Sequence, residues 1–235
     1  MNKVQDQPAF ILHQRPYRDT SHIIELFSRD YGRFSVVSRG SRSARSRTRS
    51  ILQPFRPLYV SWSGKGEMPS LTGAEPANRR IPQLRGDQLA SGFYINELLM
   101  RLLHRFDVQD EIYALYEQTL YQLAAGQSLQ HTLRYFEKHL LELLGFALNL
   151  SVDADSGEAV EAKVDYRYQI EHGPVRLDPL LDTATTLVIS GASLLALDQD
   201  ALQSEQALKD AKRLMRQVLA FYLEGKPLKS RELFR

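Results

Sequence analysis

The chain has 235 residues, of which 43% are hydrophobic and 25% charged, as in ordinary globular proteins. It contains no cysteine, which excludes disulfides, thiolate metal sites and cysteine nucleophiles. Residues 1–80 hold 14 Lys and Arg against 6 Asp and Glu, whereas the remaining residues hold 16 against 22. The strongly basic N-terminal third therefore predicts contact with a polyanion, and the acidic remainder predicts a different role.

The hydropathy of the chain argues against a membrane location. No apolar run approaches the roughly 20 residues that cross a bilayer. Residues 1–8 lack the apolar segment of a signal peptide. We therefore expect no membrane contact and a location in the cytoplasm.

Residues 8–75 predict five short strands. The runs that are rich in apolar and β-forming residues are 9–13, 21–28, 34–38, 58–62 and 69–74. The turn at 30–33 joins the second and third runs as a hairpin, and the turn at 63–67 separates the last two. Five short strands in about 70 residues are typical of a small closed barrel such as the OB-fold.

Between the third and fourth predicted strands, residues 39–50 consist almost entirely of Arg and Ser. Such a segment cannot bury apolar surface, so we expect an exposed loop. Its guanidinium groups are spaced so that several can reach phosphates at once, namely those of Arg39, Arg42, Arg45, Arg47 and Arg49. Nothing in the loop reads base edges, which predicts binding that ignores base sequence. A loop that is merely solvated is the alternative, but charge of one sign within a basic domain favours nucleic acid.

Aromatic side chains of the barrel can stack on bases, as in other OB-folds. The candidates are Tyr17, Phe34, Tyr59 and Trp62. Alternation places Trp62 on the same face as Leu58 and Val60, which predicts a core position. Tyr59 lies on the opposite face and is the better stacking candidate. A core role remains the alternative for each of the four.

After a linker at 76–86 the chain predicts mostly helices. Their ranges are 89–103, 110–123, 129–144, 193–197 and 208–223. Residues 150–187 are mixed and polar, with weak strands at 166–170 and 175–177. The fold class is therefore α+β, with a basic, DNA-binding OB-fold at 1–80 and a mainly helical domain at 81–235.

The third predicted helix carries a second candidate site. Arg134 and Lys138 are four residues apart and share a face, beside the apolar Leu133 and Phe136. A basic head next to an apolar groove suits a peptide with an acidic, hydrophobic C-terminus. An amphipathic core helix with two solvated cations is the alternative, and the pattern alone favours it.

No motif indicates catalysis. The acidic stretch 153–161 fails the calcium-loop spacing, because Gly157 comes one place early and a third carboxylate is missing. The six histidines show no close metal spacing, and no nucleophile–base pair stands out. We therefore predict no catalytic residue, no metal site and no cofactor. A metal-dependent nuclease stays open as an alternative, because catalytic residues need not be adjacent in sequence.

The order of several segments resembles the RecO family of bacterial recombination mediators, over almost the whole chain. They are residues 9–21 (AFILHQRPYRDTS), 32–42 (GRFSVVSRGSR), 52–58 (LQPFRPL), 94–99 (YINELL), 144–150 (LGFALNL) and 225–234 (GKPLKSRELF). The resemblance implies binding to single- and double-stranded DNA, annealing of complementary strands, and no enzymatic activity. It also implies three protein partners: the acidic C-terminal tail of single-stranded-DNA-binding protein, RecR, and indirectly the recombinase RecA.

These readings together assign two groups of site residues. DNA contacts are expected from Arg33, Arg39, Arg42, Arg45, Arg47, Arg49, Lys65 and Tyr59. By position Arg134 matches the basic residue that the family uses near the tail, and we expect Lys138 and Leu133 beside it. A protein-interaction adaptor that does not bind DNA is the second alternative.

Many relatives carry a four-cysteine zinc module after the segment that matches Gly145-Phe146. Because this chain has no cysteine, we expect no zinc and a degenerate remnant of that module at 150–187. The loss puts in doubt any partner contact that depends on zinc in those relatives.

Overall fold

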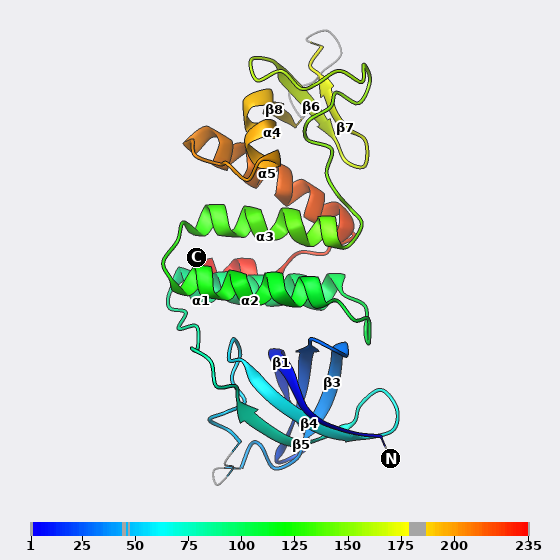
Figure 1. The fold of residues 1–235 in the computed structure, drawn as a ribbon, viewed down its shortest axis with the longest axis vertical. Coiled ribbons are helices and arrows are strands. Elements are labelled where there is room, and N and C mark those ends of the chain that lie inside the picture. Colours follow the sequence, from blue (N-terminus) through cyan, green and yellow to red (C-terminus); the bar gives the residue numbers. More distant parts are fainter. Residues whose placement is uncertain (1, 44–45, 47, 179–186, 235) are drawn as a thin grey trace. The chain divides into compact units, whose positions relative to one another are not determined.

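The computed structural model describes residues 2–43, 46, 48–178 and 187–234 (Figure 1). The chain divides into two compact units, one formed by Met1–Gly126 with Leu228–Arg235 and the other by Gln127–Pro227. Within the described ranges, no helix is both long enough and apolar enough to span a bilayer.

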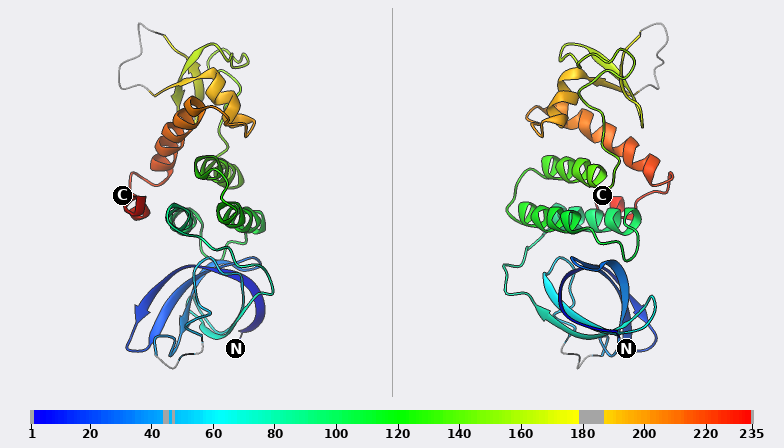
Figure 2. Two further views of the ribbon diagram at one scale, coloured as in Figure 1. Left: turned by 90° about the vertical axis from the view of Figure 1, so that its left-hand side faces the viewer. Right: turned by 45° about the vertical axis from the view of Figure 1, so that its right-hand side comes forward.

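Five strands of the first unit close into a barrel. They are β1 (Asn2–Tyr17), β2 (Ser21–Ser28), β3 (Gly32–Ser38), β4 (Leu58–Gly64) and β5 (Ser70–Pro76). The order is β1-β2-β3-β5-β4, and β4 pairs with β1 to close the sheet (Figure 2). All neighbours are antiparallel except β3 and β5, which are parallel. The five predicted strands are confirmed, although β1 is much longer than the short run expected at 9–13.

The barrel encloses an apolar core because residues along each strand alternate between inside and outside. Ile24, Phe34 and Val60 are among the buried side chains that fill it. Trp62 joins them with 6% of its surface exposed, so the prediction of a core position is confirmed. Full burial of one such side chain contributes about 1.5–3 kcal/mol to stability.

Two helices, α1 (Asp87–Leu102) and α2 (Asp110–Ala124), belong to the same unit as the barrel. Asn96 of α1 is 2% exposed, and its Nδ2 donates a hydrogen bond to the Leu12 carbonyl of β1 at 2.8 Å. Its Oδ1 accepts from the Tyr116 hydroxyl of α2 at 2.7 Å. One buried amide thus joins a strand and two helices, which helps to explain why this compact unit extends to Gly126 rather than ending near residue 80.

The C-terminal segment packs on α1 through Glu97, which follows Asn96 in that helix. The short 3₁₀ helix η1 (Lys229–Phe234) presents its first backbone amides to this carboxylate. Glu97 accepts hydrogen bonds from the Lys229 amide at 3.1 Å and from the Ser230 amide and hydroxyl at 2.8 and 2.7 Å. Burial raises the pKa of Glu97, but these hydrogen bonds and the charge of Arg101 outweigh it and leave the pKa below its ordinary value.

The second unit combines three helices with a small sheet. The elements are α3 (Leu129–Leu143), β6 (Asp165–Gln169), β7 (Gly173–Arg176), β8 (Val188–Ser190), α4 (Gly191–Asp198) and α5 (Glu205–Tyr222). The sheet order is β7-β6-β8. The predicted helices and the two weak strands are present within a few residues, whereas β8 was not predicted because three residues carry no readable alternation.

The loop before β6 is organised by a buried carboxylate. Asp153 is 4% exposed and accepts backbone hydrogen bonds from Asp155, Ser156 and Arg176 at 3.0–3.1 Å. Burial raises its pKa, but these hydrogen bonds outweigh the effect and leave the pKa below its ordinary value. The residues of this segment do not fit a zinc module, because the chain has no cysteine and the described residues contain no cluster of three metal-binding side chains.

Candidate nucleic-acid interface

A pocket of about 630 Å³ lies where the β1–β2 turn, the end of β3 and the start of β5 come together, and we call it the turn pocket. Arg18 and Thr20 of the β1–β2 turn line it, together with Arg39 and Met68. The Arg18 guanidinium lies 5.1 Å from the centre of the Tyr17 ring. Arg18 and Arg39 are exposed, so two positive charges border this pocket, beside the exposed carboxylate of Asp19.

A second pocket, of about 440 Å³, lies at the end of the barrel beside the Arg/Ser loop, and we call it the mouth pocket. Its lining residues are Gln14, His22, Ser41, Arg42, Arg49, Leu52 and Gln53. The Arg42 amide donates to the Thr20 carbonyl at 2.9 Å, and its guanidinium donates to the Arg18 carbonyl at 3.1 Å. These bonds hold the start of the loop against the β1–β2 turn and bring Arg42 and Arg49 to one pocket.

The loop arginines keep their charge available. Arg39, Arg42 and Arg49 are exposed, and none of them pairs with a carboxylate among the described residues. Lys65 is likewise exposed, in the turn between β4 and β5. Arg45 and Arg47 lie outside the described residues. The predicted loop therefore offers several exposed cations that are not paired with a carboxylate among the described residues.

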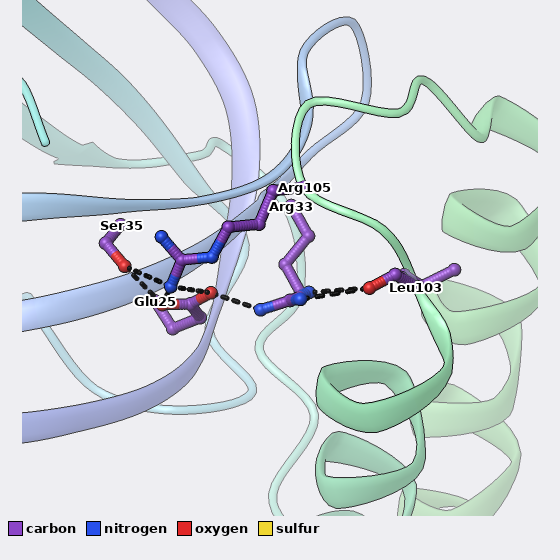
Figure 3. A network of polar contacts seen from close by, with 5 residues as sticks. All are labelled: Glu25, Arg33, Ser35, Leu103 and Arg105. Atoms are coloured by element: carbon purple, nitrogen blue, oxygen red, sulfur yellow. Dashed lines mark hydrogen bonds and ion pairs between the residues drawn. The ribbon is translucent and has the colours of Figure 1, made fainter. Parts of the chain in front are cut away.

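Arg33 differs from the loop arginines because its charge is used inside the protein (Figure 3). Its side chain is 12% exposed, forms an ion pair with Glu25 of β2, and donates to the Leu103 carbonyl at 2.9 and 3.2 Å. Ser35 and Arg105 complete the network around the same carboxylate, at 2.5 and 3.4 Å. Removing one partner from such a buried pair is costly, so Arg33 is held in place. In this conformation it is not free to meet a phosphate.

Tyr59 is 39% exposed and lies on the outer face of β4, as alternation predicts. It lines a small cavity of about 130 Å³ together with Arg29, Arg79 and Tyr113. This cavity shares no lining residue with the turn or mouth pocket. The structure therefore does not bring Tyr59 together with the loop arginines.

The three residues predicted to hold a peptide tail lie on α3. Leu133 and Arg134 are 7% and 6% exposed, and Arg134 forms an ion pair with the buried Glu137. The Arg134 Nε is buried and has no hydrogen-bond partner among the described residues. In this conformation the arginine is neither the solvated cation of the alternative interpretation nor the head of an open groove.

Lys138 stabilises the end of α4. Its ammonium group donates to the Leu197 and Asp198 carbonyls at 3.0 and 2.9 Å and pairs with Asp200 at 2.7 Å. A cation at a helix C-terminus satisfies carbonyls that have no partner within the helix. Asp200 also accepts from His139 at 2.9 Å. Lys138 is therefore already fully engaged within the second unit.

Sequence reasoning missed Arg18 and His22 as candidate site residues. A single arginine in a two-strand turn carries no pattern, but its place directly after Tyr17 is a signal for cation–aromatic contact. His22 lies two residues before the core residue Ile24 on the same strand, so alternation alone places it on the inner face. Its contact with the loop depends on the loop's path across the barrel.

Comparison with known proteins gives one consistent result. A family model described as Recombination protein O N terminal matches residues 1–80, and one described as Recombination protein O C terminal matches residues 83–232. The chain is 47% identical to the DNA repair protein RecO of Alkalilimnicola ehrlichii, over 100% of this chain and 92% of that protein. It is 45% identical to that of Nitrosococcus oceani, over 97% and 91%, and 43% identical to that of Dechloromonas aromatica, over 100% and 96%.

Proposed function

Because the chain belongs to the RecO family of DNA repair proteins, we propose that it binds DNA through its barrel and mediates recombination without making or breaking a covalent bond. The observation that carries the proposal is the group of exposed, uncompensated guanidinium groups of Arg39, Arg42 and Arg49. Each can pair with a phosphate irrespective of the base attached to it. The substrate class is therefore DNA backbone, single- or double-stranded.

We assign the barrel to the OB-fold. Such folds bind oligonucleotides on the face of strands 2 and 3, between the first-to-second and fourth-to-fifth strand turns. The turn pocket occupies that position, since its lining comes from the β1–β2 turn, the end of β3 and the segment that leads into β5. Arg18 and Lys65 supply cations from the two turns. Arg33, paired with Glu25, supports the strand face instead of contacting DNA.

The mechanism follows from charge neutralisation. Two complementary strands repel each other through their phosphates, and a basic surface that binds both lowers this repulsion and favours annealing. We infer that the second unit meanwhile holds the acidic tail of single-stranded-DNA-binding protein and concentrates the mediator on coated DNA. RecR and, indirectly, RecA are the further partners that family membership supports. Such a protein acts in the cytoplasm, at the nucleoid.

An annealing assay tests this function against its two alternatives. Complementary strands with fluorescent labels are mixed with the protein, with and without Mg²⁺. We expect the strands to anneal faster in its presence and to stay intact in both conditions, because the proposed mechanism needs no catalyst. Cleavage that requires Mg²⁺ would indicate a nuclease. Neither annealing nor cleavage, together with no DNA binding at low salt, would indicate a protein adaptor.

We propose that Arg134 forms the carboxylate-binding part of the tail site. Its Nε is a buried donor without a partner among the described residues, and a donor of this kind gains from a ligand oxygen. The C-terminal carboxylate of a tail peptide supplies that oxygen, while Leu133 contributes apolar contact. Because Leu133 and Arg134 are buried here, binding requires neighbouring side chains to move aside.

Variants of the Arg134–Glu137 pair test this site with a peptide that has an acidic, hydrophobic C-terminus. The double variant Arg134→Gln/Glu137→Gln removes both charges together, which avoids leaving one buried charge unpaired. We expect it to bind the peptide about 10- to 100-fold more weakly, since charged hydrogen bonds contribute roughly 1.5–3 kcal/mol. Fluorescence anisotropy of the labelled peptide gives the affinity.

The control is Glu137→Gln alone, which keeps the Arg134 charge. Because this single change leaves that buried charge unpaired, circular dichroism first checks that the variant is folded. It should still distinguish the free peptide from its C-terminal amide, whereas the double variant should not. If the double variant bound both peptides as the unmodified protein does, Arg134 would not hold the carboxylate.

We also infer that residues 150–187 are a remnant of the family's zinc module. The hydrogen bonds that Asp153 accepts from three backbone amides hold the loop together without a metal ion. A contact with RecR that depends on zinc in relatives would have to be made here by other groups.

A further inference from the structure

The inner layer of the barrel changes from apolar to polar at one end. His22 lies two residues before the core residue Ile24 on β2 and therefore faces inward with it. Gln14 pairs with Ile24 across β1 and β2 and faces the same way. Leu52, which belongs to the core, lines the mouth pocket together with both residues. The mouth pocket is thus a polar hollow that rests directly on the apolar core.

Positive groups converge on this hollow. Arg42 and Arg49 reach it from the loop, and no carboxylate is found among its described lining residues. His22 Nδ1 lies 2.9 Å from the Ser41 hydroxyl, which itself donates to the Ser38 carbonyl at 2.9 Å. Because Ser41 donates its hydroxyl proton to the Ser38 carbonyl, its oxygen accepts a hydrogen bond from the Nδ1–H of His22. The other ring nitrogen, Nε2, is then the one that takes up a proton when His22 becomes charged.

We propose that the mouth pocket is a phosphate-binding subsite, in which Arg42, Arg49 and a protonated His22 together hold one phosphate group of bound DNA. The proposal rests on the proposed function, since the phosphate belongs to the DNA strand. A volume of about 440 Å³ accommodates a phosphate with its sugar. A terminal phosphate and an internal diester share this chemistry, and both can reach a hollow that opens at the end of the barrel.

The subsite makes DNA binding depend on pH. Burial lowers the pKa of His22 below its ordinary value of 6.5, and the charges of Arg42 and Arg49 lower it further. The flanking positions on β1 and β3, Pro16 and Ser38, carry no charge. Without DNA, His22 is therefore neutral at pH 7, and a bound phosphate raises its pKa. Binding takes up a proton, so affinity is constant at high pH and rises as the pH falls through the pKa of the bound state.

The test follows the binding of a labelled oligothymidylate between about pH 8 and pH 5.5 at fixed ionic strength. Unmodified protein is compared with His22→Gln and with a matched control, His172→Gln, whose exposed ring lies in the other unit. We expect the unmodified protein and the control to gain about tenfold in affinity at low pH, because protonation of His22 adds one charged hydrogen bond to the phosphate. His22→Gln should lose this gain.

The strand is used with a 5′-phosphate and with a 5′-hydroxyl group. A terminal phosphate titrates near pH 6 itself, so the readout is the difference between His22→Gln and unmodified protein on the same strand. A larger difference on the phosphorylated strand supports the subsite and assigns it to strand ends. An equal difference on both strands supports it and assigns it to internal phosphates.

Nuclear magnetic resonance of the unmodified protein gives a second measurement that does not depend on the folding of a variant. The pKa of His22, followed by its ring-proton shift, should rise when the oligothymidylate is added. An unchanged pKa, or the same pH dependence in His22→Gln as in unmodified protein, overturns the subsite while DNA binding itself stands. If the unmodified protein did not bind DNA at all at low salt, the proposed function itself would be wrong.

Discussion

Replacing Arg42 and Arg49 together with alanine is expected to weaken duplex binding about 60-fold at about 0.1 M salt. Each phosphate contact contributes a log–log salt slope of about −0.9 on duplex. Relative to about 1 M salt, where the contact contributes little, this slope corresponds to about eightfold in affinity at about 0.1 M. The slope should therefore decrease in magnitude by about 1.8, and the loss of affinity should shrink to about three- to fourfold at about 0.5 M. On single strands, where each contact contributes about −0.7, we expect about 25-fold at 0.1 M.

A titration of labelled DNA at several salt concentrations measures both the affinity and the slope. The matched control is Lys212→Ala/Arg216→Ala, which removes two exposed cations from α5 and changes the net charge equally. It should bind DNA as the unmodified protein does, because the second unit is not the proposed DNA surface. Since Arg42 and Arg49 are exposed, their loss should change the free energy of unfolding by less than about 0.5 kcal/mol. If affinity and slope did not change, these arginines would not contact phosphate.

Replacing Asn96 with alanine is expected to lower the free energy of unfolding of the first unit by about 4 kcal/mol. The change leaves the Leu12 carbonyl and the Tyr116 hydroxyl without the partners they have at 2.8 and 2.7 Å. Each buried polar group without a partner costs about 1–3 kcal/mol. Burial raises the pKa of Tyr116 far above its ordinary value, so its hydroxyl stays protonated and remains a buried donor without an acceptor.

Thermal denaturation followed by circular dichroism measures this loss, which should lower Tm by about 10 °C. Asn78→Ala is the matched control, because Asn78 is exposed in the linker. Tyr116→Phe should give a smaller loss, since it removes only one of the two hydrogen bonds. A loss below about 1 kcal/mol for Asn96→Ala would show that the amide does not join the barrel to the helices.

Local patterns were sufficient to predict the elements of the barrel and the basic loop. Alternation at 58–62 correctly assigned Trp62 to the core and Tyr59 to the outer face. The composition of residues 39–50 predicted a loop whose arginines are exposed, and those described are exposed. Both predictions depend on neighbours in sequence, which is the information that periodicity and composition contain.

The fate of individual charges could not be predicted in this way. Arg33 and Arg39 are six residues apart and look alike in the sequence, yet Arg33 is paired with Glu25 and bonded to the Leu103 carbonyl. Arg134 appeared to be a surface cation of an amphipathic helix, and the structure buries it against Glu137. Whether a cation stays exposed or is paired within the protein depends on which carboxylates and carbonyls the fold brings close to it.

The sequence by itself determined the fold class, the strand and helix positions, the basic character of the first third and the family. Tertiary structure alone decided which charges remain available and where the polar end of the barrel lies. It also showed what two residues of the segment 94–99 do in the fold. Asn96 bonds to Leu12, and Glu97 bonds to Ser230. The physical reason is that a hydrogen bond or ion pair needs two groups within about 3 Å. Residues 84 or 133 positions apart meet only once the chain has folded.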